Sequence, residues 1–170
     1  MEDIASLENR VRVLEEQCQR LTDIEAIRKL RGRYWRCMRE RLFDDLVGCY
    51  AEEAVVNFGF GIHLQGKEAL AKYYNETIAK LHTMIIPQGH NPEIEITGET
   101  TATGRWLIDN PQVEASTKTA ARLGSTYEEE YLKENGEWKI GRQKVHHIYR
   151  ELIKMDSPKN VFKTDEPSQV

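Results

Sequence analysis

The sequence is poor in the residues that stabilise secreted or membrane-embedded proteins. Its 170 residues include three cysteines, Cys18, Cys37 and Cys49, whose spacing fits neither a metal site nor an even set of disulfides. No apolar run approaches the roughly 20 residues that cross a bilayer. The first residues are charged and lack the apolar segment of a signal peptide. We therefore expect a cytoplasmic protein with reduced thiols.

Several signatures of well-known chemistries are also missing. The sequence has no GxGxxG loop, no phosphate-binding P-loop, no zinc-ligand pattern and no G-x-S-x-G nucleophile elbow. Its net charge of −4 gives no general attraction for nucleic acid or for anionic lipid. We expect no metal, no cofactor, no nucleic-acid partner and no membrane partner, and we expect a hydrophobic small molecule as the ligand.

The composition is that of one folded domain, with 39% hydrophobic and 31% charged residues. Three parts follow from the pattern along the chain. Residues 1–22 form a heptad helix, residues 23–155 form the domain, and residues 156–170 form a polar, flexible tail that contains Pro158 and Pro167.

An apolar residue recurs every three or four positions in the first segment: Ile4, Leu7, Val11, Leu14, Cys18 and Leu21. This spacing is the a/d seam of a coiled coil over about two and a half heptads. We expect an oligomerisation arm that packs on a sister subunit in a homodimer or homotrimer. A helix that folds back on its own domain is the alternative.

The rhythm changes at Thr22-Asp23-Ile24-Glu25, a capping-box pattern that predicts the start of a new helix ending near Arg41. A short helix is expected at 43–50. The buried stripe of the longer helix is predicted from helical spacing: Ile24, Ile27, Leu30, Tyr34 and Met38.

Period-two alternation and turn residues predict the strands, and a third helix follows Gly66 and ends at His82. The predicted strands lie at 54–58, 62–64, 94–96, 101–113, 117–133 and 138–151. Asn135-Gly136 is a strong hairpin signal between the last two strands. Helices on one face of a strongly bent sheet enclose a hollow. We therefore predict an α+β fold in which a cone-shaped, curved antiparallel sheet is packed by three helices, with the N-terminal arm as an additional helix.

Three stretches resemble a known family. They are D-I-E-A-I-R-K-L-R-G-R-Y at 23–34, G-H-N-P-E-I-E-I-T at 89–97 and T-A-T-G-R-W at 101–106. They are similar to SnoaL-like proteins of the NTF2-like superfamily, and most of all to the bile-acid 7α-dehydratases. The resemblance implies the cone fold. It also implies elimination of water next to an enone by a His/Asp pair with a Tyr and an Arg in a dry pocket.

The resemblance matches one position of that catalytic set, the helix tyrosine at Tyr34. It places Arg39 and Asn110 where the family has aspartates. It places Pro87 at the family's histidine and His147 at its arginine. Elimination by the family's own His/Asp pair is therefore not expected here, so acid–base chemistry would need other residues.

From the residues themselves, we expect Tyr34 to polarise or protonate a substrate oxygen, His147 to act as the base and Asn110 to orient the substrate. Each has a structural alternative, since a buried tyrosine or histidine is often only a packing residue with satisfied hydrogen bonds. A bulge at Pro111 could turn Asp109 inward. The side chains predicted to bind substrate are Trp106, Ile108, Tyr149, Phe58, His90 and Asp109.

The expected function is that of a cofactor-independent lyase or isomerase, namely a dehydratase, isomerase or cyclase. It would act by proton transfer on a hydrophobic, oxygenated compound such as a steroid or a polyketide. The alternative is a ligand-binding or scaffolding protein without catalysis. A cavity where Tyr34 and His147 converge would favour the enzyme, and a cavity filled by the chain's own side chains would favour the scaffold.

Overall fold

The computed structural model describes residues 3–114 and 118–154, so the predicted tail at 156–170 lies outside the described residues. The elements in chain order are α1 (Ile4–Glu40), α2 (Phe43–Val47), β1 (Tyr50–Gly59), β2 (Ile62–Gln65), α3 (Gly66–Lys72), the π-helix η1 (Tyr73–Ile78), α4 (Ala79–Leu81), β3 (His82–Ile85), β4 (Gln88–Ile96), β5 (Thr101–Glu114), β6 (Thr119–Glu134) and β7 (Glu137–Lys154). None of the described helices combines the length and the apolarity that a bilayer crossing requires.

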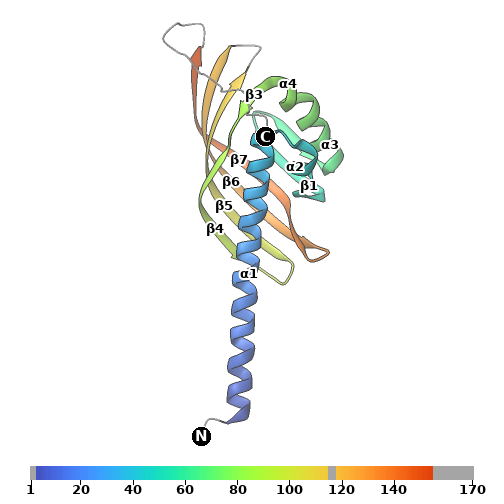
Figure 1. The fold of residues 1–170 in the computed structure, drawn as a ribbon, viewed down its shortest axis with the longest axis vertical. Helices are drawn as coiled ribbons and strands as arrows, with labels where there is room; N and C mark the ends of the chain where they lie inside the picture. Colours follow the sequence, from blue (N-terminus) through green and yellow to red (C-terminus); the bar gives the residue numbers. More distant parts are fainter. Residues whose placement is uncertain (1–2, 115–117, 155–170) are drawn as a thin grey trace, which may run out of the picture.

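The strands form one seven-stranded sheet in the order β2-β1-β7-β6-β5-β3, and β4 also pairs with β5. The β1–β7 pair is parallel and the other pairs are antiparallel, so the sheet is mixed. The sheet curves, and the helices lie on one side of it (Figure 1). The predicted α+β fold, with helices packed on a curved sheet and an additional helix at the N-terminus, is confirmed. The sheet is not antiparallel throughout as predicted, because β1 pairs in parallel with β7.

The predicted break at Thr22 is wrong, because α1 runs without interruption from Ile4 to Glu40. The Thr22 hydroxyl donates to the carbonyl oxygen of Cys18, four residues earlier, at 2.8 Å. Inside a continuous helix the backbone amides already have partners, so a threonine has nothing to cap and its hydroxyl bonds back along the helix.

Burial nevertheless changes at the predicted boundary. Every described residue up to Thr22 is exposed, and the first buried residue is Asp23. Asp23 accepts a hydrogen bond from Trp138 Nε1 at 2.8 Å and forms an ion pair with Lys133 at 2.7 Å. These contacts attach α1 to the hairpin of β6 and β7, so the N-terminal part of the helix projects beyond the domain (Figure 1).

The docked part of α1 buries the predicted stripe: Ile27, Leu30, Tyr34 and Met38 are buried, and Ile24 is half-buried. The stripe joins the main core between the helices and the sheet, where about 0.8 kcal/mol is gained for each buried methylene. Asn135 and Gly136 both have positive φ, at 51° and 81°, and form the predicted tight turn between β6 and β7.

The third helix differs from the prediction in two ways. Its centre is the π-helix η1, and consecutive Tyr73 and Tyr74 in that turn both line the cavity described below. It also ends earlier than predicted, since His82 begins the strand β3, which pairs with the end of β5. His82 pairs with Glu114 of β5, so His82 lies on the sheet rather than on a helix.

Candidate functional site

A cavity of about 210 Å³ lies between the helices and the sheet. Most of its wall is apolar or aromatic: Met38, Phe58, Phe60, Ile62, Tyr73, Ile78, Leu81, Ile85, Pro87, Leu123, Tyr127 and Val145. The polar and charged side chains on the wall are Tyr34, Tyr74, His82, Asn110, Gln112, Glu114, His147 and Arg150. An apolar hollow with a few convergent polar groups is the usual form of a small-molecule site. The chain's own side chains therefore do not fill the cone.

Four of the sequence-predicted residues line this cavity, and they come from four different elements. Tyr34 is on α1, Phe58 on β1, Asn110 on β5 and His147 on β7. The fold thus brings together side chains that are up to 113 positions apart in the sequence, counting from 34 to 147.

Tyr34 is the end of a buried chain of hydroxyl groups. Its oxygen lies 3.1 Å from that of Tyr74, which lies 3.1 Å from that of Tyr50. Tyr50 donates to Gln143 Oε1 at 2.8 Å. Burial raises the pKa of Tyr34, Tyr74 and Tyr50, so these phenols stay protonated at neutral pH.

The direction of this chain follows from counting protons, because a phenol has only one to donate. Tyr50 donates its proton to Gln143, so Tyr74 must donate to Tyr50 and Tyr34 must donate to Tyr74. Gln143 Nε2 is buried and has no hydrogen-bond partner among the described residues. If the amide turned over, Gln143 would donate to Tyr50, every bond would reverse and the Tyr34 proton would become available to a ligand.

Asn110 presents a buried acceptor at the cavity wall. Its Oδ1 has no hydrogen-bond partner in the described part of the chain. An unpaired buried polar atom costs about 1–3 kcal/mol, so a donor group on a ligand would be stabilised there. Asn110 therefore has a free acceptor where substrate orientation was predicted.

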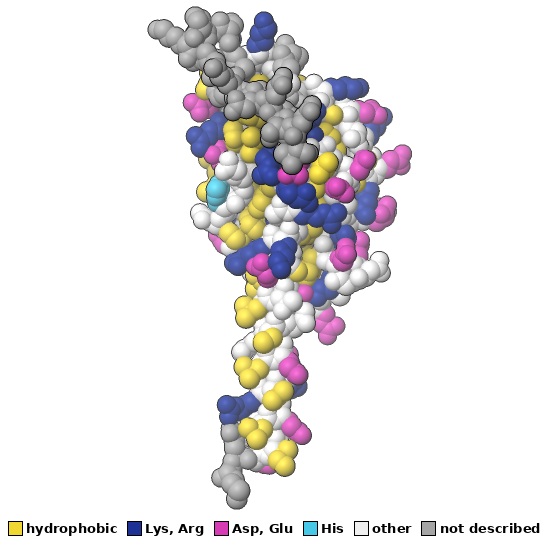
Figure 2. Space-filling model, in the orientation of Figure 1, with side chains coloured by type: hydrophobic (Ala, Val, Ile, Leu, Met, Phe, Trp, Pro, Cys, Tyr) yellow, Lys and Arg dark blue, Asp and Glu magenta, His cyan; other side chains and the backbone are white. Residues whose placement is uncertain are grey.

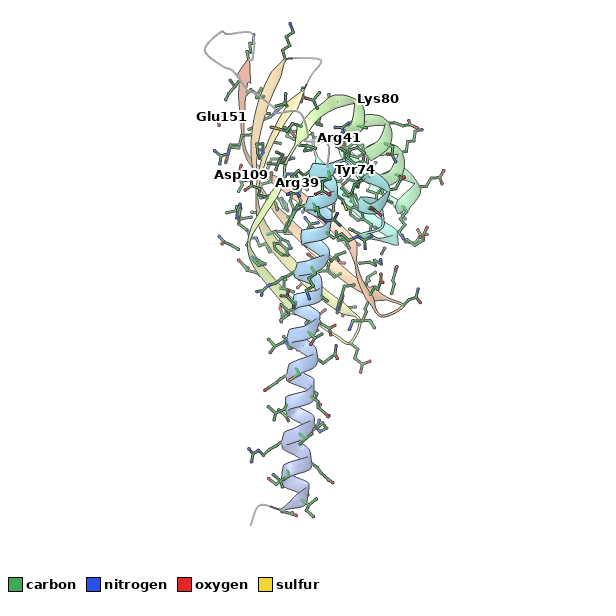
Figure 3. All side chains as sticks on the ribbon, viewed as in Figure 1. Arg39, Arg41, Tyr74, Lys80, Asp109 and Glu151 are labelled. Carbon is green, nitrogen blue, oxygen red and sulfur yellow. The ribbon has the colours of Figure 1, made fainter. Side chains whose placement is uncertain are left out.

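Asp109 points the other way, and the predicted bulge at Pro111 is absent from the β5–β6 ladder, whose register runs through this point without a shift. Pro111 instead lies at the point where the partner of β5 changes from β4 to β3. No hydrogen bond between strands is lost there, although proline has no amide hydrogen to donate. Asp109 accepts two hydrogen bonds from Arg122, at 2.8 and 2.6 Å, which lower its pKa. In Figure 3 it lies away from Tyr74, across the sheet.

His147 lines the cavity, but both of its ring nitrogens have protein partners. Nε2 lies 2.9 Å from the carbonyl oxygen of Phe58, which can only accept, so Nε2 carries the proton. Nδ1 therefore accepts from the Ser125 hydroxyl at 3.0 Å. The ring also stacks on Phe60 at 4.2 Å. These contacts tie β7 to the end of β1 and favour the structural alternative for His147.

A bulge in β7 explains why Tyr149 lies outside the cavity wall. Ser125 pairs with His147 and Gly124 pairs with Tyr149, so Ile148 is an extra residue on β7. The alternation of side chains shifts by one at this point. Tyr149 turns to the other face, where it packs over Gly124, and Arg150 takes the inward position at the cavity wall.

The other predicted binding residues also lie away from the wall. Trp106 and Ile108 are buried in a second core cluster behind Tyr127 and Val145. Trp106 donates to the Tyr131 hydroxyl at 2.9 Å and packs against Trp35. His90 is exposed on β4, because β4 covers the outer edge of β5 rather than the hollow.

His82 is the residue that sequence reasoning undervalued. It lines the cavity, it is 5% exposed, and its Nδ1 is buried with no hydrogen-bond partner among the described residues. Burial lowers its pKa, and the cationic Arg41 and Arg150 act in the same direction while Glu114 opposes them. A neutral histidine with a free ring nitrogen is a competent general base.

Arg41 fixes the backbone around His82. Its guanidinium donates to the carbonyl oxygens of His82 and Ala79, both at 2.6 Å. Figure 3 shows Arg41 at the C-terminal end of α1, where the helix reaches the turn that precedes β3. Arg41, the residue that follows α1, thus satisfies one carbonyl of α4 and one of β3 and holds the start of β3 in place.

Arg39, which stands where the family resemblance expects an aspartate, does not line the cavity. Its side chain is half-exposed and bonds Glu40 at 2.9 Å. Pro87, which stands at the family's histidine, does line the wall. Where the family resemblance expects an aspartate and a histidine, the chain therefore has an arginine outside the cavity wall and a proline on it.

A second buried polar group lies behind the wall. Arg31 and Glu129 are fully buried and form an ion pair at 3.3 Å. The Arg31 guanidinium also lies over the rings of Tyr34 and Tyr127, at 4.2 and 5.5 Å. Burial disfavours the Arg31 cation, but the facing carboxylate outweighs it, so the pKa of Arg31 lies above its ordinary value. Tyr131 completes the group by donating to Glu129.

The family model of the SnoaL-like domain matches residues 19–144, and the chain belongs to this family. The matched region covers the docked part of α1, all the short helices and most of the sheet.

Solved structures share this fold at low sequence identity. A type-2 hexachlorocyclohexane dehydrochlorinase (LinA) is 16% identical with a TM-score of 0.77, and covers 89% of this chain and 99% of its own. LinA-type3 from Novosphingobium barchaimii LL02 is 17% identical with a TM-score of 0.74, over 81% and 94%. An NTF2-like protein with a cystatin-like fold from Novosphingobium aromaticivorans is 17% identical with a TM-score of 0.64, over 94% and 96%.

Proposed function

We propose that the protein is a cofactor-independent lyase or isomerase that moves a proton on a small, mostly apolar, oxygenated molecule. The observation that carries the proposal is that Asn110 and His82 line a mostly apolar cavity and each has a buried atom, Oδ1 and Nδ1, without a hydrogen-bond partner among the described residues. Other buried atoms also have no such partner, on Arg31, Trp35, Glu129 and Gln143, but these four residues do not line the cavity. Buried polar groups in a stable protein are normally paired, so we infer that the two at the cavity meet a ligand. The dehydrochlorinases that share the fold support an elimination of the same general kind.

His82 is the proposed base. Its lowered pKa keeps the ring neutral near pH 7, so Nδ1 can accept a proton from a carbon next to a carbonyl group. His147, the base expected from the sequence, is the second candidate, because Ser125 would have to turn from donor to acceptor before Nδ1 could take a proton. The two histidines therefore give distinguishable variants.

Tyr34 is the proposed partner of the substrate carbonyl oxygen. The phenol would donate to the oxygen as negative charge develops there, either by leaving Tyr74 or by reversal of the tyrosine chain through Gln143. Asn110 would accept from a hydroxyl group of the same molecule. In a dehydration that hydroxyl would leave as water with a returned proton, and in an isomerisation the proton would return at a different carbon.

The volume of the cavity limits how much of a substrate can lie inside it. A cavity of about 210 Å³ is little larger than the roughly 150 Å³ that holds one benzene ring. We therefore propose a hydroxy-ketone with one ring inside the cavity. A steroid or polyketide would fit only if its remaining rings extended through the opening beside Arg150.

Proton exchange gives a test that does not require the natural substrate. The protein would be incubated in D₂O with cyclic β-hydroxy ketones of one or two rings, and deuterium at the α-carbon would be followed by NMR. The wild type is expected to accelerate this exchange. His82→Gln should lower the rate about 10²–10⁴-fold by removing the base, and Tyr34→Phe about 10²–10³-fold by removing a donor to the oxygen.

His147→Gln is the matched control for the base. It should stay within a few-fold of the wild-type exchange rate if His82 takes the proton. The opposite order, with His147→Gln inactive and His82→Gln active, would transfer the role of base to His147. Binding of the ketones without any exchange would instead support the ligand-binding alternative and would disprove catalysis of this type.

A further inference from the structure

The N-terminal part of α1 carries an apolar seam that nothing in the described chain covers. Ile4, Leu7, Val11, Leu14 and Leu21 are between 45% and 73% exposed, and Cys18 is exposed as well. Hydrophobic side chains follow one another along this projecting helix in Figure 2. An uncovered row of large apolar side chains usually marks a contact surface.

The seam and the docked stripe lie on opposite sides of one continuous helix. At 100° per residue, the centre of the row from Ile4 to Leu21 is about 170° away from the centre of the stripe from Asp23 to Met38. The seam therefore faces away from the domain that the same helix supports. This geometry is inconsistent with the alternative in which the arm folds back on its own domain.

We propose that residues 4–21 form a parallel, in-register, two-stranded coiled coil with the arm of a second copy of this chain. The seam has β-branched Ile4 and Val11 at a positions and Leu7, Leu14 and Leu21 at d positions. This distribution favours two parallel strands over three or four. Because each seam faces away from its own domain, the two domains come to lie on opposite sides of the pair without collision.

Charge supports the parallel orientation. In a parallel pair, Arg10 at a g position lies beside Glu15 at the e position of the other strand, which is an attractive contact made twice. The pair at the tip, Asp3 and Glu8, has like charges. In an antiparallel pair, Glu8 would lie beside Glu15 on both sides and no attractive contact would replace the one with Arg10.

The folded domain also lowers the cost of forming this short coiled coil. Helix formation requires an unfavourable nucleus, but the docked half of α1 already supplies it, so the arm only extends an existing helix. The seam ends where the domain begins, since the same face continues with exposed Glu25, Lys29 and Arg36. The coiled-coil contact is therefore expected to end at Leu21.

Cys18 allows a direct test of orientation and register. In the proposed pair the two Cys18 side chains share one a layer, within the Cα–Cα range of about 4.4–6.8 Å that a disulfide needs. In an antiparallel pair Cys18 would lie beside Leu7 of the other strand, and the two thiols would be about 16 Å apart. The other two cysteines, Cys37 and Cys49, are buried.

The wild-type protein would be oxidised with diamide, which takes up the two protons and two electrons released by the two thiols. A non-reducing gel is expected to show a band at twice the 19.8 kDa of one chain. Cys18→Ser should abolish that band. In the Cys18→Ser background, Val11→Cys at an a position should restore it, whereas Val13→Cys at an outward c position should not. Absence of the wild-type band, or equal bands from both introduced cysteines, would overturn the proposal.

The mass in solution tests the role of the seam independently. By light scattering under reducing conditions the protein should have twice the mass of one chain. Leu14→Asp should convert it to the monomer, and the neighbouring Val13→Asp, which is 38% exposed in the wild type and off the seam, should not. A wild-type monomer, a trimer, or a Leu14→Asp mass that is unchanged would each disprove the two-stranded arm. Circular dichroism would verify that each variant is folded.

Discussion

Two polar regions lie near the same cavity wall, and they differ in whether their buried groups face an opposite charge. Behind the wall, the Arg31 cation forms an ion pair with Glu129, which accepts from Tyr131, although the Arg31 nitrogens and Glu129 Oε1 have no hydrogen-bond partner in the described part of the chain. On the wall, Asn110 and His82 each keep a buried atom without a partner in the described residues. A polar group that is paired within the protein holds the architecture, whereas one that is left open lowers stability and is available to a ligand.

The two histidines of the wall repeat this contrast. His147 on β7 contacts Phe58 of β1 through Nε2 and Ser125 of β6 through Nδ1, whereas His82 Nδ1 on β3 has no partner among the described residues. The two regions and the two histidines should therefore differ in their contributions to the free energy of unfolding, whichever substrate the cavity holds.

The largest effect is expected for the paired region. Glu129→Ala would leave the Arg31 cation buried without its carboxylate, which should lower the free energy of unfolding by about 3–5 kcal/mol. The measurement is urea denaturation followed by circular dichroism. The double variant Arg31→Met with Glu129→Leu should recover most of this loss, since no charge remains. A Glu129→Ala cost below about 1 kcal/mol would mean that the pair does not hold the wall.

The next effect separates the two histidines. His147→Leu removes the donor to the Phe58 carbonyl and the acceptor of the Ser125 hydroxyl, so it should cost about 1–3 kcal/mol in the same denaturation experiment. The His82 side chain has no hydrogen bond to another described residue, so His82→Leu should cost less than about 1 kcal/mol. Equal losses would remove the distinction between a structural and an available histidine.

A smaller effect of opposite sign is expected at Asn110. Asn110→Leu has a similar shape and removes an unpaired buried acceptor, so it should raise the free energy of unfolding by about 1 kcal/mol. Asn110→Asp is the control, because it places a charge in the same apolar wall and should destabilise the protein. A clear loss of stability in the leucine variant would indicate that the amide has a structural partner.

The smallest effect is a change of stability with pH. The pKa of His82 is lowered by burial, so just below pH 6.5 the unfolded chain binds more protons than the folded one. The contribution of His82 to the free energy of unfolding should therefore be complete above about pH 6.5. It should decrease as the pH falls towards the pKa of His82 in the folded state. In His82→Gln, the free energy of unfolding should change less with pH than in the wild type between about pH 6.5 and 5. An identical slope in the variant would show that His82 does not contribute to it.

The sequence predicts the fold well because its signals are local. The helical spacing of Ile27, Leu30 and Tyr34, and the Asn135-Gly136 turn, specify elements that need no distant contact to be recognised. The break predicted at Thr22 fails for the same reason. A capping pattern says which residues could start a helix, but it cannot show that the preceding turn of helix is already present.

The site is only partly predictable because it depends on pairing between distant strands. Helical spacing predicts Tyr34, and side-chain alternation predicts Asn110 and His147; these three residues and Phe58 line the cavity. The same alternation predicts Trp106, Ile108 and Tyr149 there as well, and these three do not line it. His82 was missed because strand β3 is short and exists only through its pairing with the end of β5. The four-residue strand has no periodic signal that would distinguish it from the end of a helix.

The extra residue at Ile148 has a consequence for how β7 can vary in length. Tyr149 already lies opposite Gly124 and Arg150 opposite Leu123. Loss of Ile148 would therefore close the bulge and leave both pairings in place, with Arg150 still at the cavity wall. The strand can thus lose one residue here without a change in the charge that it presents to a ligand.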